Sequence, residues 1–468
     1  MAHWRWRVLA MAATSTLVMA SPLCTGTAAA LTPPVVDPAA VPPDKPPAPD
    51  EPLRMEHACS ISGVLPGTDL GAPSVSQVFM DLPGLWKSAG RGAGVAVGVI
   101  DTGVSPSPRL PHVHGGGDYV VPEANGLADC DAHGTVVASI IGAAPAETDG
   151  VVGVAPDADI VSVRQSSEAF APANPSPGDF AADRRAGTVS SLAKAVVHIA
   201  NMGVRVINMS IVACIPVLKP VDQTTLGAAL RYAAVDKDVV IVAASGNLAG
   251  PDCAQNPDID ATNPKDPRNW AGVVTISTPS WFSNYVLSVS AVDGNGKPAV
   301  DDHGREISLA GPWVGAGAPG IFVEGFDDKG GVINATFDAN AGQLRAINGT
   351  SFSAAYVSGL AALVRAKYPK LTAAQVINRI EQTAHSPAAI VDNRVGYGAI
   401  DPAAALNNDV PLGAARPRES LSRSLELPPP PLPPDHRPML VAVVGSAVGL
   451  AAILLVFFVS NLVRERKS

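Results

Sequence analysis

The segment VAVGVIDTG, residues 95–103, decides the fold class. Its first six residues form a continuous apolar run, which is typical of a strand buried on both faces of a parallel sheet. Four further runs have the same character, namely Ile160–Val163, Val206–Ile211, Val239–Ala244 and Leu287–Ala291. Asp101 directly follows the first run, and a polar residue in that position is often only a turn former.

Helical patterns alternate with these runs and continue after them. The segments with apolar residues at helical spacing are Thr135–Ile141, Val189–Met202, Thr224–Val235, Phe352–Lys367 and Thr372–Thr383. The alternation predicts right-handed crossovers and an α/β domain, with a mostly parallel sheet flanked by helices on both faces. Functional side chains are then expected in loops at the carboxyl ends of the strands.

The N-terminal 58 residues are predicted to lie outside the folded domain. Residues 1–30 contain Arg5 and Arg7, then an apolar run and three closing alanines, which is the pattern of a cleaved secretory signal peptide. Residues 31–58 are rich in proline and too poor in core residues to fold alone. They are interpreted as an arm on the domain, with a simple spacer as the alternative.

The C-terminal end resembles a membrane anchor. The domain is expected over residues 59–410, followed by a second proline-rich linker over 411–438 and a transmembrane helix over 439–463. Cationic residues in the tail, 464–468, favour the cytoplasmic side. The sequence therefore predicts a single-pass protein of the cell membrane whose domain lies on the extracytoplasmic side. A buried core helix is the alternative.

Charge and cysteine content narrow the class of protein. The 468 residues include 33 Lys+Arg and 42 Asp+Glu, and a net charge of −9 argues against a basic surface that binds nucleic acid. Without Cys24 of the predicted signal, four cysteines remain: Cys59, Cys130, Cys214 and Cys253. An even number in an exported chain predicts two disulfides, with three pairings open.

Three short polar motifs follow or begin the predicted elements. Asp101 stands in Asp-Thr-Gly, His133 begins His-Gly-Thr at the start of a helix, and Ser351 stands in Asn-Gly-Thr-Ser before another helix. Taken singly, they are a turn residue, a structural histidine and a helix N-cap. Taken together, a hydroxyl, an imidazole and a carboxylate are the groups that nucleophilic catalysis requires.

In the order Asp, His, Ser, these motifs resemble those of the subtilisin-like serine proteases, whose triad has this order. The resemblance implies that Ser351 attacks the peptide carbonyl, that His133 acts as base and then acid, and that Asp101 orients His133. It places the oxyanion donor at Asn247, in Ser-Gly-Asn after the fourth predicted strand.

Substrate contacts are also implied by this resemblance. Ser210 and Ile211 match the edge segment that pairs with the substrate backbone. The chain departs from the family where Ile211 and Val212 stand in place of a small glycine, which predicts a narrow first specificity pocket. Two polar stretches, Ser166–Gly187 and Pro251–Trp270, are interpreted as inserted loops that restrict access, with plain surface loops as the alternative.

Cofactor and metal motifs are missing from the sequence. It contains no dinucleotide fingerprint and no phosphate-binding loop. His112 and His114 have no third ligand at a suitable spacing. Neither a cofactor nor a metal is therefore expected.

The whole layout resembles a narrower group, the mycosins, which are membrane-anchored subtilisin-like serine proteases of type VII secretion systems. The strings at residues 129–134 and 348–359 support this resemblance. It implies a peptidase domain that processes protein or peptide substrates secreted by the type VII system and that associates with membrane components of the secretion complex. The alternative is mainly a scaffold that stabilises this complex, with secondary proteolysis.

The cysteine pairing can then be predicted from the strand order. Cys214 and Cys253 each follow one of two strands whose carboxyl ends should lie close together, so they are expected to pair. By exclusion Cys59 pairs with Cys130, which would fasten the arm near His133.

Overall fold

The computed structural model describes residues 31–174, 185–250, 252–338, 341–422 and 437–466. The chain divides into two units, one up to Arg423 and one from Ser424 onward. The predicted signal peptide, residues 1–30, lies outside the described residues.

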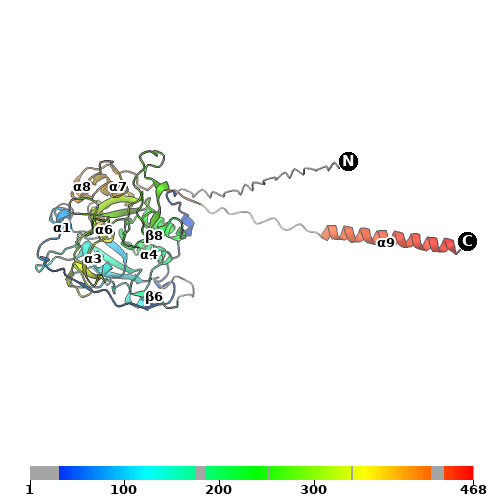
Figure 1. Ribbon diagram of the computed structural model, residues 1–468, viewed down its shortest axis with the longest axis horizontal. Helices are drawn as coiled ribbons and strands as arrows, with labels where there is room; N and C mark the ends of the chain where they lie inside the picture. Colours follow the sequence, from blue (N-terminus) through cyan, green and yellow to red (C-terminus); the bar gives the residue numbers. More distant parts are fainter. Residues whose placement is uncertain (1–30, 175–184, 251, 339–340, 423–436, 467–468) are drawn as a thin grey trace, which may run out of the picture. The chain divides into compact units, whose positions relative to one another are not determined.

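A seven-stranded sheet forms the centre of the first unit (Figure 1). Its order is β12-β11-β9-β7-β3-β5-β4, and every neighbouring pair is parallel. The predicted parallel α/β architecture is therefore confirmed. The strands are β3 (Ala96–Asp101), β4 (Val113–Asp118), β5 (Asp159–Arg164), β7 (Val206–Met209), β9 (Val240–Ala244), β11 (Val286–Val292) and β12 (Val314–Pro319).

The five predicted strands are the central five of this sheet, while its two edges were not predicted. The edge strands β4 and β12 read VHGGGD and VGAGAP, and their glycines and alanines give little strand propensity. The prediction that the third strand extends to Ile211 is wrong, because β7 ends at Met209. Ser210 and Ile211 therefore lie just beyond the strand, where the chain turns toward the site.

Helices cover both faces of the sheet. Alternate residues of β3 point to opposite sides: Val97 and Val99 pack in one core with α3 and α6, whereas Ile100 packs in a second core with α4 and α5. Gly98 lets α4 approach closely, since a Cβ there would lie 2.4 Å from Ile199 Cδ1. The helices are α1 (Val75–Met80), α2 (Leu82–Ala89), α3 (His133–Gly142), α4 (Val189–Asn201), α5 (Thr224–Arg231), α6 (Thr350–Lys367), α7 (Ala373–Thr383) and α8 (Pro402–Asn407).

Short elements join loops around this core. Strand β1 pairs with β6, β8 with β10, β13 with β14, and β15 with both β2 and β16. They are β1 (Leu53–Met55), β2 (Ser62–Gly63), β6 (Phe170–Pro172), β8 (Ala213–Pro216), β10 (Thr275–Thr278), β13 (Gly325–Phe326), β14 (Val332–Ile333), β15 (Ala335–Asp338) and β16 (Gln343–Ala346). Single helical turns are η1 (Pro38–Ala40), η2 (Pro122–Ala124), η4 (Tyr232–Asp236) and η5 (Trp270–Gly272).

The proline-rich arm lies along the surface of this unit. Asp44 accepts hydrogen bonds from His198 and Asn201 of α4, and Asp50 pairs with Lys194 of the same helix. Because these contacts repeat along α4, the arm is held at several points and is not a simple spacer.

Part of the predicted linker also belongs to the domain. The Val36 backbone N–H donates to Ser420 O at 2.9 Å, and the Ser422 N–H donates to Val36 O at 2.8 Å. Glu419 forms an ion pair with Arg231 at 2.7 Å. Residues 419–422 of the predicted linker therefore have backbone and charged partners on the domain. Residues 423–436 lie outside the described residues.

The second unit contains helix α9 (Arg437–Glu465). This helix has 29 residues and is long and apolar enough to cross a membrane, by length and composition. It begins two residues before the predicted span at 439.

Candidate active site

Asp101 and His133 meet where β3 ends and α3 begins. His133 is the first residue of α3, and its Nδ1 lies 2.7 Å from Asp101 Oδ1. The Thr102 backbone N–H donates to the same carboxylate oxygen at 2.7 Å. Asp101 is fully buried, while the His133 side chain is 30% exposed. The carboxylate thus fixes one ring nitrogen, and Nε2 is left to exchange a proton with another group.

The loop before His133 is held by a second buried acid, Asp129, which was not predicted as a site residue. Ala132 adopts a left-handed backbone conformation with φ 62° immediately before the helix. Asp129 accepts hydrogen bonds from the Thr135 backbone N–H at 2.8 Å and from the Thr135 hydroxyl at 2.6 Å. The sequence signals for Asp129 are its place four residues before His133 and its place in the string at residues 129–134 that resembles the mycosins.

Ser351 lies in the first turn of α6, after Gly349, which has a φ of 155°. Its hydroxyl donates to the carbonyl oxygen of Ser210 at 3.0 Å, and the Ser210 hydroxyl donates to the Ser351 carbonyl oxygen at 2.8 Å. Among the residues described, no hydrogen bond joins Ser351 Oγ to His133. Both side chains line one cavity of about 280 Å³, so the hydroxyl faces the same space as the imidazole.

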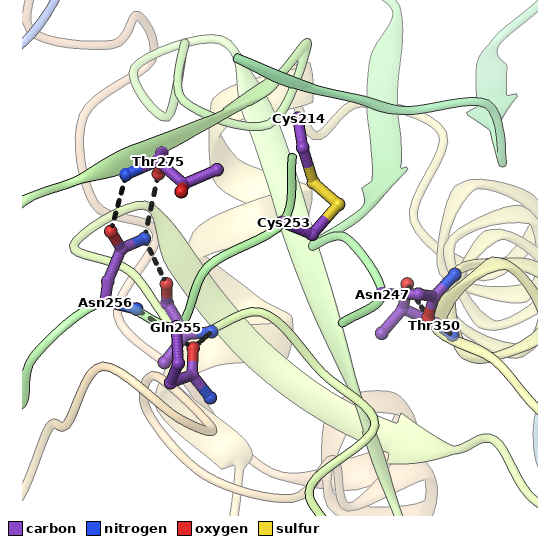
Figure 2. Close-up of a disulfide and its surroundings, with 8 residues drawn as sticks. Cys214, Asn247, Cys253, Gln255, Asn256, Thr275 and Thr350 are labelled. Atoms are coloured by element: carbon purple, nitrogen blue, oxygen red, sulfur yellow. Dashed lines mark hydrogen bonds between the residues drawn. A yellow bond between two sulfur atoms is a disulfide. The ribbon is translucent and has the colours of Figure 1, made fainter. Parts of the chain in front are cut away.

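Asn247 follows β9 and lies beside the start of α6 (Figure 2). Its Oδ1 accepts from the backbone N–H and the hydroxyl of Thr350, both at 3.0 Å. Since the oxygen is engaged, the amide Nδ2 is the group available to a ligand. The Ser351 backbone N–H is in the first helical turn, whose N–H groups have no intrahelical acceptor. Two donors are thus available next to the Ser351 hydroxyl.

Ser210, predicted to contact substrate, is tied into the protein on two sides. Its hydroxyl accepts from Asn208 Nδ2 at 2.8 Å, and Asn208 Oδ1 accepts from Ser358 of α6 at 2.9 Å. Ile211 is only partly buried next to it. The segment after β7 is therefore fastened to the helix that carries Ser351.

The site cavity is closed by segments far away in the sequence. Ser60, just after the arm, and Thr336 and Ala346 from the β15–β16 hairpin line it with His133 and Ser351. A second cavity, of about 730 Å³, shares Asn247 and Asn348 with the first and includes Asp301, Arg305 and Glu306. The site is thus a recess that continues past Asn247.

Both predicted cysteine pairs are bonded in the structure. Cys59 joins Cys130 with a Cα–Cα distance of 4.6 Å, and Cys214 joins Cys253 at 5.2 Å. The first disulfide fastens the arm to the loop that precedes His133. The second fastens β8 to the loop that follows Asn247 (Figure 2). Each disulfide therefore lies beside a predicted site residue.

The loop after Cys253 is anchored by Asn256, which is buried (Figure 2). The Asn256 amide donates to Thr275 O at 2.9 Å and Ala310 O at 2.7 Å. Its oxygen accepts from the N–H groups of Val274 and Thr275 at 2.9 and 3.0 Å. The inserted loop is therefore built into the domain at this point.

Among the described residues, no group of three His, Cys, Asp or Glu side chains is placed to hold a metal.

The chain is similar to known proteins over most of its length. The model of the subtilase family matches residues 92–398. Mycosin-3 of Mycobacterium tuberculosis is 48% identical over 366 residues, which cover 77% of each chain. Mycosin-5 of the same organism is 40% identical over an alignment that covers 96% of each chain.

Solved structures are similar as well. The crystal structure of MycP1 from Mycobacterium smegmatis has 45% identity and a TM-score of 0.77, covering 85% of this chain and all of that one. A chain of the intact ESX-5 inner membrane complex has 48% identity and a TM-score of 0.77, covering 92% of this chain and all of that one. The chain therefore belongs to the subtilase family, the subtilisin-like serine endopeptidases. Within that family its relatives place it among the mycosins, as the sequence predicted.

Proposed function

We propose that the chain is an active endopeptidase in which Ser351 is the nucleophile, His133 the general base and Asp101 the residue that orients His133. The observation that carries the proposal is the 2.7 Å contact of His133 Nδ1 with the buried Asp101 carboxylate, in the cavity that Ser351 also lines. A hydroxyl becomes an effective nucleophile only when a neighbouring base takes its proton.

Attack begins when the Ser351 hydroxyl leaves the Ser210 carbonyl and turns toward His133 Nε2. The proton passes to His133 as Oγ bonds to the substrate carbonyl carbon. Burial lowers the pKa of His133, but the charge of Asp101 and its hydrogen bond outweigh burial, and the net pKa is raised. Asp101 therefore stabilises the imidazolium that forms.

The negative charge on the substrate oxygen is stabilised by the Asn247 amide and the Ser351 backbone N–H. Thr350 holds the Asn247 oxygen, so the amide is oriented before substrate binds. One such donor contributes about 3 kcal/mol to transition-state stabilisation. His133 then gives its proton to the leaving amine, and water resolves the acyl-enzyme by the same steps in reverse.

We further propose that the domain lies on the extracytoplasmic side of the membrane and is anchored there by α9. The predicted signal peptide, the two disulfides and the cationic residues after the span support this placement. Similarity to chains of the ESX-5 inner membrane complex supports association with a type VII secretion system. Proteins exported by that system are then its substrates.

The second candidate function is a scaffold role in the secretion complex. The observation in its favour is that a similar chain is part of an intact inner membrane complex. A Ser351→Ala protein expressed in place of the wild type separates the two roles. Unprocessed substrate with intact secretion indicates proteolysis plus an independent scaffold role. Unchanged processing would contradict the proposed peptidase activity.

A further inference from the structure

A buried carboxylate, Asp129, lies between the two segments that carry Asp101 and His133. Its Oδ2 accepts both Thr135 donors, at 2.8 and 2.6 Å, on the first turn of α3. Its Oδ1 accepts from the Thr102 hydroxyl at 2.8 Å, directly after β3. Asp129 is only 6% exposed, so its four lone-pair sites are used inside the protein.

The Thr102 hydroxyl has one proton and two carboxylates within reach. Asp129 Oδ1 lies at 2.8 Å and Asp101 Oδ1 at 3.2 Å. The same hydroxyl oxygen accepts the Gly134 backbone N–H at 2.9 Å. Asp101 Oδ1 already receives the Thr102 backbone N–H and His133 Nδ1, both at 2.7 Å. A third donor on this oxygen would compete with His133.

We propose that Asp129 is a positioning residue that holds the Thr102 hydroxyl away from Asp101 and so keeps the Asp101 carboxylate available to His133. The proposal rests on the function proposed above, because it concerns the same His133. The direct contacts of Asp129 are with Thr102, Thr135 and the Asp131 backbone N–H, so it acts through Thr102 and never touches the reacting atoms.

Ionisation of Asp129 is part of this arrangement. Its charged neighbours are Asp101 at the end of β3, Asp131 in its own loop and His133 on α3. Burial raises the pKa of Asp129 to about 6, and the charge of Asp101 adds to that rise. Above this pH Asp129 is an acceptor for Thr102. Below it, a protonated Asp129 can donate to Thr102 Oγ, and the Thr102 proton then turns to Asp101.

An Asp129→Asn substitution imposes the arrangement in which residue 129 donates to Thr102 and the Thr102 hydroxyl donates to Asp101. If the oxygen of the new side-chain amide accepts from the Thr135 backbone N–H, the NH₂ group of that amide faces Thr102 and can only donate. The Thr102 hydroxyl then donates to Asp101 Oδ1. This competition lowers the basicity of Asp101 and, through it, the pKa of His133. Thr102→Val removes the hydroxyl, so the same substitution at Asp129 then acts on Asp101 and His133 only through the loss of its charge.

The test is a double-mutant cycle on the full chain with Asp129→Asn, Thr102→Val and the double variant. A fluorophosphonate probe gives the second-order rate of Ser351 labelling, and NMR titration gives the His133 pKa. We expect Asp129→Asn to slow labelling about tenfold, as for a weakened general base, and by about twofold or less in the Thr102→Val background. The proposal would be overturned if Asp129→Asn slowed labelling by the same factor in both Thr102 backgrounds, or if it did not slow labelling at all.

Asp131→Asn is the control for charge, since it removes a nearby negative charge without touching Thr102. Asp131 instead accepts from Ser167 at 2.6 Å. We expect Asp131→Asn to lower the His133 pKa equally in both Thr102 backgrounds, whereas Asp129→Asn lowers it more when the hydroxyl is present. If Asp129→Asn also lowered the His133 pKa equally in both Thr102 backgrounds, Asp129 would act on His133 through its charge alone. That result would contradict the proposal.

If Asp129→Asn does not fold, the pH profile of the wild type carries the test. As pH falls through about 6, labelling should lose about a further factor of ten beyond the one-proton loss due to His133, and this extra loss should be absent in Thr102→Val. Identical one-proton profiles would overturn the proposal. If the wild type is not labelled, the proposed function fails, while the NMR titration still reports whether Asp129 acts on His133 through Thr102.

Discussion

Ser351 and Ser210 form a reciprocal pair of hydrogen bonds, each donating its hydroxyl to the carbonyl oxygen of the other, at 3.0 and 2.8 Å. The pair fastens the first turn of α6 to the segment just beyond β7. The Ser351 hydroxyl must leave this partner to reach His133. A neutral hydrogen bond contributes only about 1 kcal/mol net, so the exchange is a small barrier.

Ser210→Ala tests the pair. It removes the hydrogen bond to the Ser351 carbonyl oxygen and the one from Asn208 Nδ2, but keeps the carbonyl that accepts from Ser351. We expect a loss of about 2 kcal/mol in the free energy of unfolding, measured in denaturant, and a few-fold slower labelling by a fluorophosphonate. Ser88→Ala is the matched control, because the Ser88 hydroxyl donates to Leu85 O within its own helix, α2. If Ser88→Ala slows labelling as much, the pair has no special role.

Asn247→Ala removes the proposed side-chain donor to the oxyanion. The labelling rate should fall about 10²- to 10³-fold. The free energy of unfolding should fall by about 2 kcal/mol, because Thr350 loses two hydrogen bonds. Thr350→Val keeps the donor but removes one of the two bonds that orient it, so its effect should be smaller. An Asn247→Ala protein that reacts at the wild-type rate would exclude Asn247 from the reaction.

The pH dependence follows from the raised pKa of His133. Only the neutral imidazole accepts a proton, so activity should be lost as pH falls through the folded pKa of His133. Because this pKa is raised, the midpoint should lie above the ordinary value of about 6.5. The free energy of unfolding depends on pH in the opposite direction. The stabilisation by charged His133 is complete below the pKa of His133 in the unfolded chain, and it is lost as pH rises through the folded pKa. Labelling rates from pH 5 to 9 give the midpoint, and one below 6 would contradict the Asp101 contact.

Removal of the Cys59–Cys130 disulfide should affect both stability and activity. These cysteines are 71 residues apart, and a closed loop of this length contributes about 4 kcal/mol by limiting the unfolded chain. The loop also carries Asp129 and leads to His133. A Cys59→Ser, Cys130→Ser protein should unfold at lower denaturant concentration and label more slowly. Unchanged labelling in the folded variant would show that the arm does not support His133.

Asn256→Ala should be among the more destabilising changes in the inserted loop. It leaves four backbone groups without their hydrogen bonds, three of them in the buried residues Thr275 and Ala310 and one in Val274. We expect a loss of about 3 kcal/mol or more in the free energy of unfolding. Asn295→Ala, in an exposed turn, is the control. If Asn256→Ala and Asn295→Ala caused equally small losses in the free energy of unfolding, Asn256 would not anchor the loop.

The sequence predicts the centre of the sheet well because Val, Ile and Leu fill strands that are buried on both faces. It fails at the edges, β4 and β12, where glycine and alanine carry no periodic signal. The segments of Asp101, His133 and Ser351 were predicted from short motifs at strand and helix ends. Asp129 was missed because its role depends on Thr102 and Thr135, whose approach only the folded chain reveals.

The most direct test of Ser351 as the nucleophile is labelling of the full chain with a fluorophosphonate, followed by mass spectrometry of the peptide that contains Ser351. We expect a single phosphonylated residue, Ser351, and no labelling in the Ser351→Ala protein or in wild type unfolded before reaction. A folded wild type that remains unlabelled, or that is labelled at another serine, would contradict this role of Ser351.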